Sequence, residues 1–151
     1  HEYFRGSGDH ADFIQHNMLL KRWNAPGSQA NLYLKSGLGA AYGGGDTRAA
    51  GFTGLAADWE NRRYFASYAN RFLSAGSDNR YADHKARIGV APYIGDAGDL
   101  HTWLMLEADY NPSKKDDFSV TPLVRFFKGT TMLEAGYNPD GGGLLNFTQR
   151  F

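Results

Sequence analysis

Residues 144–151 read Leu-Leu-Asn-Phe-Thr-Gln-Arg-Phe, and this stretch decides the fold class of the chain. In an extended chain, successive side chains point to opposite faces. One face of this segment is then apolar, with Leu145, Phe147 and Phe151. The other face is polar, with Asn146, Thr148 and Arg150. This alternation behind the turn-forming residues 138–143 predicts a β-strand with one polar and one apolar side.

The same strand character recurs along the whole chain, and turn-forming residues separate the segments. The nine predicted strands cover residues 12–24, 29–42, 48–60, 63–74, 81–94, 100–110, 118–128, 130–137 and 144–151. Most exceed the roughly five or six residues usual in soluble sheets and match the roughly 9 to 11 that a tilted strand needs to cross a bilayer. Because bacterial barrels have an even number of strands, we expect a further short strand at 2–5 or one strand fewer.

Two prolines make the predicted strand boundaries weaker in their neighbourhood. Pro92 and Pro122 fall inside predicted strands, and neither can donate a ladder hydrogen bond. We expect each to mark a bulge or a strand end.

The two faces of the predicted strands differ in polarity throughout the second half of the chain. In the strand at 100–110, Leu104 and Leu106 alternate with Glu107 and Asp109. We predict that the apolar face looks outward and that the polar face lines the interior of a barrel. The predicted interior polar network consists of Lys85, Arg87, His101, Glu107, Asp109, Arg125, Glu134, Asn146 and Arg150. A soluble barrel has the same period with its faces reversed, so the period alone does not decide between them.

An alternating final strand that ends in an aromatic residue resembles the insertion signal of Gram-negative outer-membrane β-barrel proteins. Leu145, Phe147 and Phe151 carry this resemblance. It implies an all-β fold, an antiparallel up-and-down transmembrane β-barrel of about 8–10 strands, as a single domain over residues 1–151. It also implies location in the bacterial outer membrane, contact with membrane lipids and lipopolysaccharide, and assembly by the outer-membrane insertion machinery. The start at His1 leaves open a longer chain with a preceding or periplasmic domain.

Other features of the sequence favour a membrane-spanning barrel over a soluble one. Small residues recur between Gly37 and Ala57, where they suit a lipid-facing or tightly curved wall better than a soluble core. Aromatic residues stand near predicted strand ends, as in the aromatic girdles of outer-membrane barrels. They are Trp23, Tyr42, Trp59, Tyr64, Tyr110 and Tyr137. Many ionisable residues lie in mid-strand, and a small dry core could not hold them.

The composition excludes several classes of protein. The 16 Lys and Arg residues balance 16 Asp and Glu residues without a basic block, which argues against a nucleic-acid partner. Cysteine is absent, so neither disulfides nor thiolate metal sites are available. Apolar runs are far shorter than the roughly 20 residues of a spanning helix. We predict no cofactor.

The predicted function is passive: a narrow pore, a membrane anchor or a surface-binding platform. The alternatives are an outer-membrane enzyme that hydrolyses lipid or peptide at a rim site, and a soluble lipocalin-like binder. The candidate nucleophiles Ser67, Ser74 and Ser119 and the candidate bases His16, His84 and His101 stand in no recognisable motif, so no catalytic residue is predicted. Metal binding by the scattered His and Asp residues near His10 and His84 is not predicted either, because their spacing is irregular.

Overall fold

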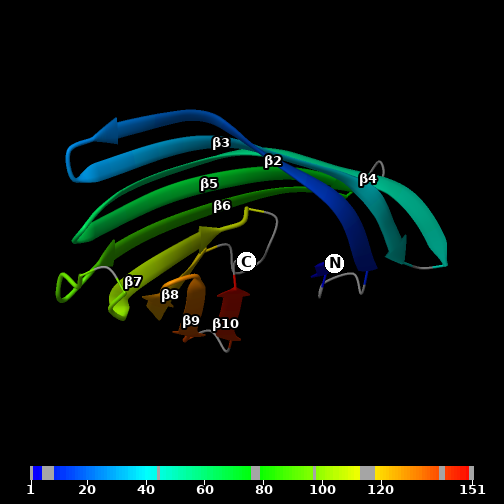
Figure 1. Cartoon of the computed structure of the whole chain (residues 1–151). Coiled ribbons are helices and arrows are strands. Elements are labelled where there is room, and N and C mark those ends of the chain that lie inside the picture. Colours follow the sequence, from blue (N-terminus) through cyan, green and yellow to red (C-terminus); the bar gives the residue numbers. More distant parts are fainter. Residues whose placement is uncertain are drawn as a thin grey trace.

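The chain folds into one antiparallel sheet (Figure 1). The computed structural model describes residues 2–4, 9–43, 45–75, 79–96, 98–112, 118–139 and 142–149. Within these residues, ten strands lie in the order of the sequence, so each pairs with its chain neighbours. The strands are β1 (Glu2–Phe4), β2 (Asp9–Ala25), β3 (Ser28–Gly43), β4 (Asp46–Asn61), β5 (Tyr64–Ala75), β6 (Asn79–Val90), β7 (His101–Tyr110), β8 (Phe118–Lys128), β9 (Thr131–Asn138) and β10 (Gly142–Gln149). No described helix is long and apolar enough to cross a membrane.

The predicted all-β, up-and-down architecture is confirmed. Nine predicted segments correspond to β2 to β10, and the further short strand expected at 2–5 is present as β1, which has three residues. The main difference lies at β6, which ends at Val90 instead of the predicted Ile94. Pro92 follows this end and has no N–H for the ladder. Pro122 remains inside β8, and the β8–β9 ladder begins just beyond it, at Leu123.

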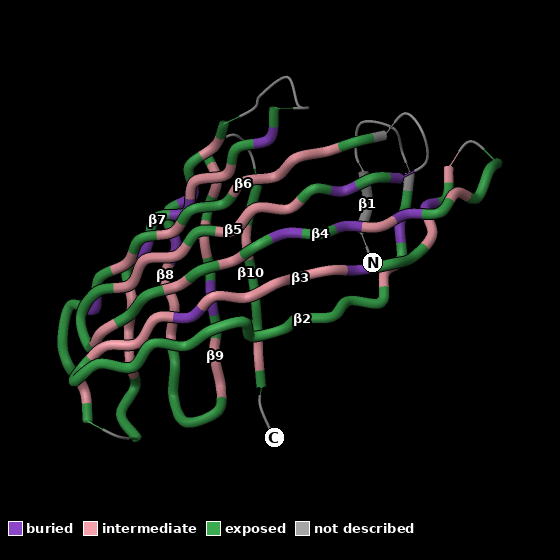
Figure 2. The backbone as a smooth tube through the Cα atoms, turned by 90° about the horizontal axis from the view of Figure 1, so that it is seen from above, coloured by how far each residue is buried: buried purple, intermediate pink, exposed green. Residues whose placement is uncertain are grey.

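The sheet curls into a half-barrel. In Figure 1, β2 to β6 arch over β7 to β10. In Figure 2, seen from above, β8 to β10 run across behind β2 to β5. Among the described residues, β10 pairs with β9 only, and neither β1 nor β2 pairs with β10. The described strands therefore form an open curled sheet and not the closed barrel expected from the sequence.

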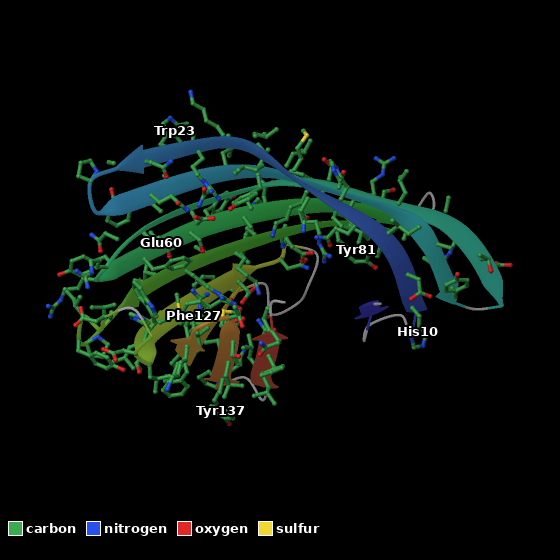
Figure 3. The ribbon with its side chains drawn as sticks, in the orientation of Figure 1. His10, Trp23, Glu60, Tyr81, Phe127 and Tyr137 are labelled. Carbon is green, nitrogen blue, oxygen red and sulfur yellow. The ribbon has the colours of Figure 1, made fainter. Side chains whose placement is uncertain are left out.

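The curl gives the sheet a concave and a convex face with different side chains. On the concave face, Glu107 and Glu134 are each 2% exposed. On the convex face, Leu104 is 48% and Phe147 is 64% exposed. Trp23 and Tyr137 project from the outside of the curled sheet (Figure 3). On β7 and β9 the polar face is thus the buried one, which agrees with the prediction from the alternating strands.

An apolar cluster covers the concave face at one end of β2 to β6. Its buried members are Ala11, Ala41, Ala50, Phe52, Leu73 and Ala75. The Phe52 ring lies over Gly37, where a Cβ atom would overlap it. Gly37, Ala41 and Ala50, three of the small residues that we expected on a lipid-facing or tightly curved wall, therefore lie on the concave side of the curved sheet. They leave room for the larger rings of Phe52 and Phe13, whose centroids are 5.3 Å apart.

Candidate functional site

A continuous network of ion pairs crosses the concave face from β6 to β9. Lys85 on β6 binds two carboxylates on β7, Glu107 at 2.8 Å and Asp109 at 3.2 Å. Arg87 on β6 binds Glu107 through Nε and Glu134 on β9 through Nη1, the latter at 3.0 Å. The strand register explains these contacts, because Lys85 is the direct partner of Asp109, and Arg87 is the direct partner of Glu107.

Glu134 is the centre of the second half of the network. Its Oε1 accepts hydrogen bonds from Arg87 at 3.0 Å and from Arg125 Nε on β8 at 2.8 Å. Its Oε2 accepts one from Asn146 Nδ2 on β10 at 2.9 Å. The Arg125 guanidinium also lies over the ring of Phe65, 5.1 Å from its centroid. Both carboxylate oxygens of a buried Glu are therefore satisfied, as burial requires.

The charges of this network balance. The cations Lys85, Arg87 and Arg125 face the carboxylates Glu107, Asp109 and Glu134. The arginine side chains are 17% exposed, whereas Lys85 and Asp109 are 45% and 38% exposed. The network is therefore closed at its Arg and Glu end and open to solvent at its Lys85 end.

Most predicted interior residues are brought together. Lys85, Arg87, Glu107, Asp109, Arg125, Glu134 and Asn146 all belong to the network. His101 shares their face but starts β7, at the opposite end from Asp109, and has no ion pair with a described residue. Arg150 and Phe151 lie outside the described residues. Of the predicted insertion signal, Leu145 and Phe147 are both exposed on the convex face.

A second polar cluster on β2 to β4 was missed in the sequence. Asn31 is buried, donates to Asp58 Oδ1 at 2.7 Å and accepts from Arg22 Nε at 2.7 Å. A β-bulge between Leu19 and Lys21 shifts the register and turns Arg22 to the concave face. If strict alternation along β2 is assumed, Arg22 is placed on the convex face, so this cluster was not recognised in the sequence.

A pocket of about 530 Å³ opens on the concave face beside Lys85. Its wall includes an ion pair between Arg71 on β5 and Asp83 on β6, 2.8 Å apart. Asn111 donates a hydrogen bond to the other oxygen of Asp83. Lys35 on β3 lines the pocket from the far side. The sequence predicted Lys85 and Asp109 as interior residues, but it did not predict the pocket, because residues from β2 to β8 form it together.

Ser119 and His101, one candidate nucleophile and one candidate base, do not lie together. Along the β7–β8 pair, Ser119 lies opposite Asp109, whereas His101 lies opposite Phe127. These positions are eight residues apart on β7, or about 27 Å at the usual rise of a strand. His84 Nδ1 lies 2.8 Å from the Tyr68 hydroxyl. The described residues contain no group of three or more His, Asp or Glu side chains that could hold a metal ion.

Comparison with known proteins adds no functional assignment. No protein-family model matches the chain, and neither a curated protein nor a solved structure matches it significantly. The function of the site is therefore inferred from its geometry alone.

The network predicts a large effect of Glu134→Gln on stability. The substitution leaves two partly buried guanidinium groups facing a neutral amide, and we expect the free energy of unfolding to fall by about 3 kcal/mol. Urea unfolding followed by tryptophan fluorescence measures this change. As a control, Glu60→Gln at the exposed end of β4 should change stability by less than about 0.5 kcal/mol.

A double variant tests whether uncompensated charge causes the loss. Adding Arg125→Gln to Glu134→Gln removes one orphaned cation and should restore part of the stability. Additive losses from the two substitutions would contradict this account of the network.

Proposed function

We propose that this chain is an integral outer-membrane β-barrel whose interior is a closed, charge-paired plug, and that it serves as an anchor or surface-binding platform. One observation carries the proposal. From β3 to β10, the register places only two Asp, Glu, Lys or Arg side chains of the described strands on the convex face. These are Arg80 and Lys128, which lie at strand ends. Water imposes no such restriction on an exposed face, whereas hydrocarbon does.

Aromatic side chains stand at both ends of the convex face, which also carries Asp12 and Lys21 on β2. Trp23, Trp59 and Tyr64 lie near one end of the strands, and Tyr42, Tyr110 and Tyr137 lie near the other. All six are exposed. Amphipathic rings in these positions suit the headgroup regions on the two sides of a bilayer. Their arrangement supports a spanning orientation of the strands.

The convex face also carries an apolar groove of about 1020 Å³ over β5 to β9. Ile88, Leu104, Leu106 and Val124 line it. An exposed apolar surface of this extent is costly in water and favourable in lipid. The partners that we propose for this face are membrane lipids and lipopolysaccharide, with the outer-membrane insertion machinery acting during assembly. A periplasmic or preceding domain would be a further partner.

Insertion requires the open sheet to close. The end strands β1 and β10 expose backbone N–H and C=O groups along their free edges, and each such group costs several kcal/mol in hydrocarbon. β1 and β10 run in opposite directions, because an even number of strands separates the two ends of the up-and-down order. We propose that these edges pair antiparallel in the membrane. The closed barrel would then have a narrow interior, which the ion-pair network crosses from β6 to β9.

Lysine at two positions of the convex face tests its contact with lipid. Leu106→Lys places a charge in the middle of β7, and we expect a loss of about 2–4 kcal/mol in folding into a bilayer. Tyr137→Lys, near the end of β9, is the matched control and should cost about 0–1 kcal/mol. Flotation with phospholipid vesicles measures the inserted, protease-resistant fraction. Equal insertion of both variants, or a wild type that remains monomeric in water without detergent, would argue for a soluble protein.

Disulfide formation tests the closure, and the absence of native cysteine gives a clean background. Tyr3→Cys on β1 is combined in turn with Gly143→Cys, Leu145→Cys or Phe147→Cys on β10. We expect one pair to oxidise in vesicles, because neighbouring strands bring Cα atoms to within about 7 Å. Thr148→Cys, which faces the other side of β10, is the control and should not pair with Tyr3→Cys. If none of the three pairs forms a disulfide, β1 and β10 do not meet.

Planar-bilayer recording distinguishes the plug from a pore. The ion pairs from Lys85 to Glu134 cross the concave face from β6 to β9, so we expect the purified wild-type protein to insert without a steady conductance step. A reproducible step would contradict the plug and favour transport.

A further inference from the structure

Among the described residues of the ion-pair network and of the pocket beside Lys85, the positive charges exceed the negative charges by one. The cations on this part of the concave face are Lys35, Arg71, Lys85, Arg87 and Arg125, and the carboxylates are Asp83, Glu107, Asp109 and Glu134. Every one of these groups except Lys35 has an ion pair in the network or with Asp83. Lys35 has none with any described residue, although it lines the pocket.

The groups around Lys35 are preorganised. Arg71 is held by Asp83 at 2.8 Å, and its guanidinium lies over the Phe52 ring, 5.6 Å from the centroid. Phe52 is fixed in turn by its position over Gly37. Arg71 and Phe52 are therefore in place beside Lys35 before a ligand arrives, which lowers the cost of binding.

The opposite wall offers uncharged polar groups. Ser119 on β8 lines the pocket, and its hydroxyl makes no hydrogen bond with a described residue. The buried Asn111 also lines it, whereas Gln15 lies beside Lys35, on the neighbouring strand β2. Hydroxyl and amide groups of this kind recognise the hydroxyl groups of a ligand. The volume of about 530 Å³ lies within the range of roughly 300–1,000 Å³ usual for small-molecule sites.

We propose that this pocket binds a small, hydroxyl-rich organic carboxylate, the size of a sugar acid, with its carboxylate on Lys35 and its hydroxyl groups toward Ser119 and Asn111. A single negative charge matches the single surplus cation. A neutral sugar leaves Lys35 without a partner, and a polyvalent anion meets Asp83 and Asp109 as well. The inference concerns the concave pocket and not the lipid contact of the convex face, so its failure leaves the proposed membrane function standing.

The test is calorimetric titration of the full chain, folded in detergent micelles, with glucuronate and with glucose. The two probes share a hydroxyl-bearing ring and differ in the carboxylate. We expect glucuronate to bind, and glucose to bind at least about tenfold more weakly, because a charged hydrogen bond is lost. Lys35→Gln should weaken glucuronate binding about tenfold or more, and Lys35→Arg should retain it.

Lys21→Gln is the matched control. Lys21 lies on β2 outside the pocket, with its ammonium 5.1 Å from the centroid of the Trp23 ring, so this substitution should leave glucuronate binding unchanged. Any of three results would overturn the proposal: no glucuronate binding by the folded wild type, equal affinity for glucose, or unchanged glucuronate binding by a folded Lys35→Gln variant.

Discussion

The structure depends on the neutralisation of Glu107 and Glu134 on the concave face. A carboxylate buried without a partner costs several kcal/mol, and Arg87 bridges these two. The partners come from β6 to β10, so the ion pairs join strands that are not all neighbours in the sheet. A slip of one residue in any of these strands would turn its charges to the convex face. The network therefore selects the register as well as stabilising the fold.

The pairing of charges on the concave face also gives the two faces of the sheet different polarity. Charged side chains that pair with one another on the inside leave the outside to Leu104, Phe147 and the other exposed apolar residues. In water this arrangement would be unfavourable, because about 25 cal/mol is lost for each Å² of apolar surface left exposed. In a bilayer the arrangement is stable, provided that the free strand edges are satisfied. The proposal of a membrane protein thus follows from the location of the charged side chains on the concave face. It does not require a particular activity.

The strand order and the interior network could be predicted from the sequence because both depend on local alternation. Lys85, Arg87, Glu107 and Glu134 alternate with apolar neighbours, and direct strand pairing brings them together. The place of Arg22 in the cluster around Asn31 could not be predicted, because the bulge after Leu19 inverts the faces of β2. The pocket could not be predicted either, because its walls come from strands as distant as β2 and β8, and the curvature that joins them leaves no local pattern.

Lys85 connects the pocket to the network and limits how a ligand can bind. Asp109 has its ion pair with Lys85, at 3.2 Å, and Glu107 shares the same ammonium at 2.8 Å. An anion that took Lys85 as its main contact would have to displace Asp109 and leave that carboxylate without compensation. An anion bound by Lys35 displaces no carboxylate of the described network. Lys35 on β3 can therefore bind an anion without disturbing the ion pairs that fix the register of β6 to β9.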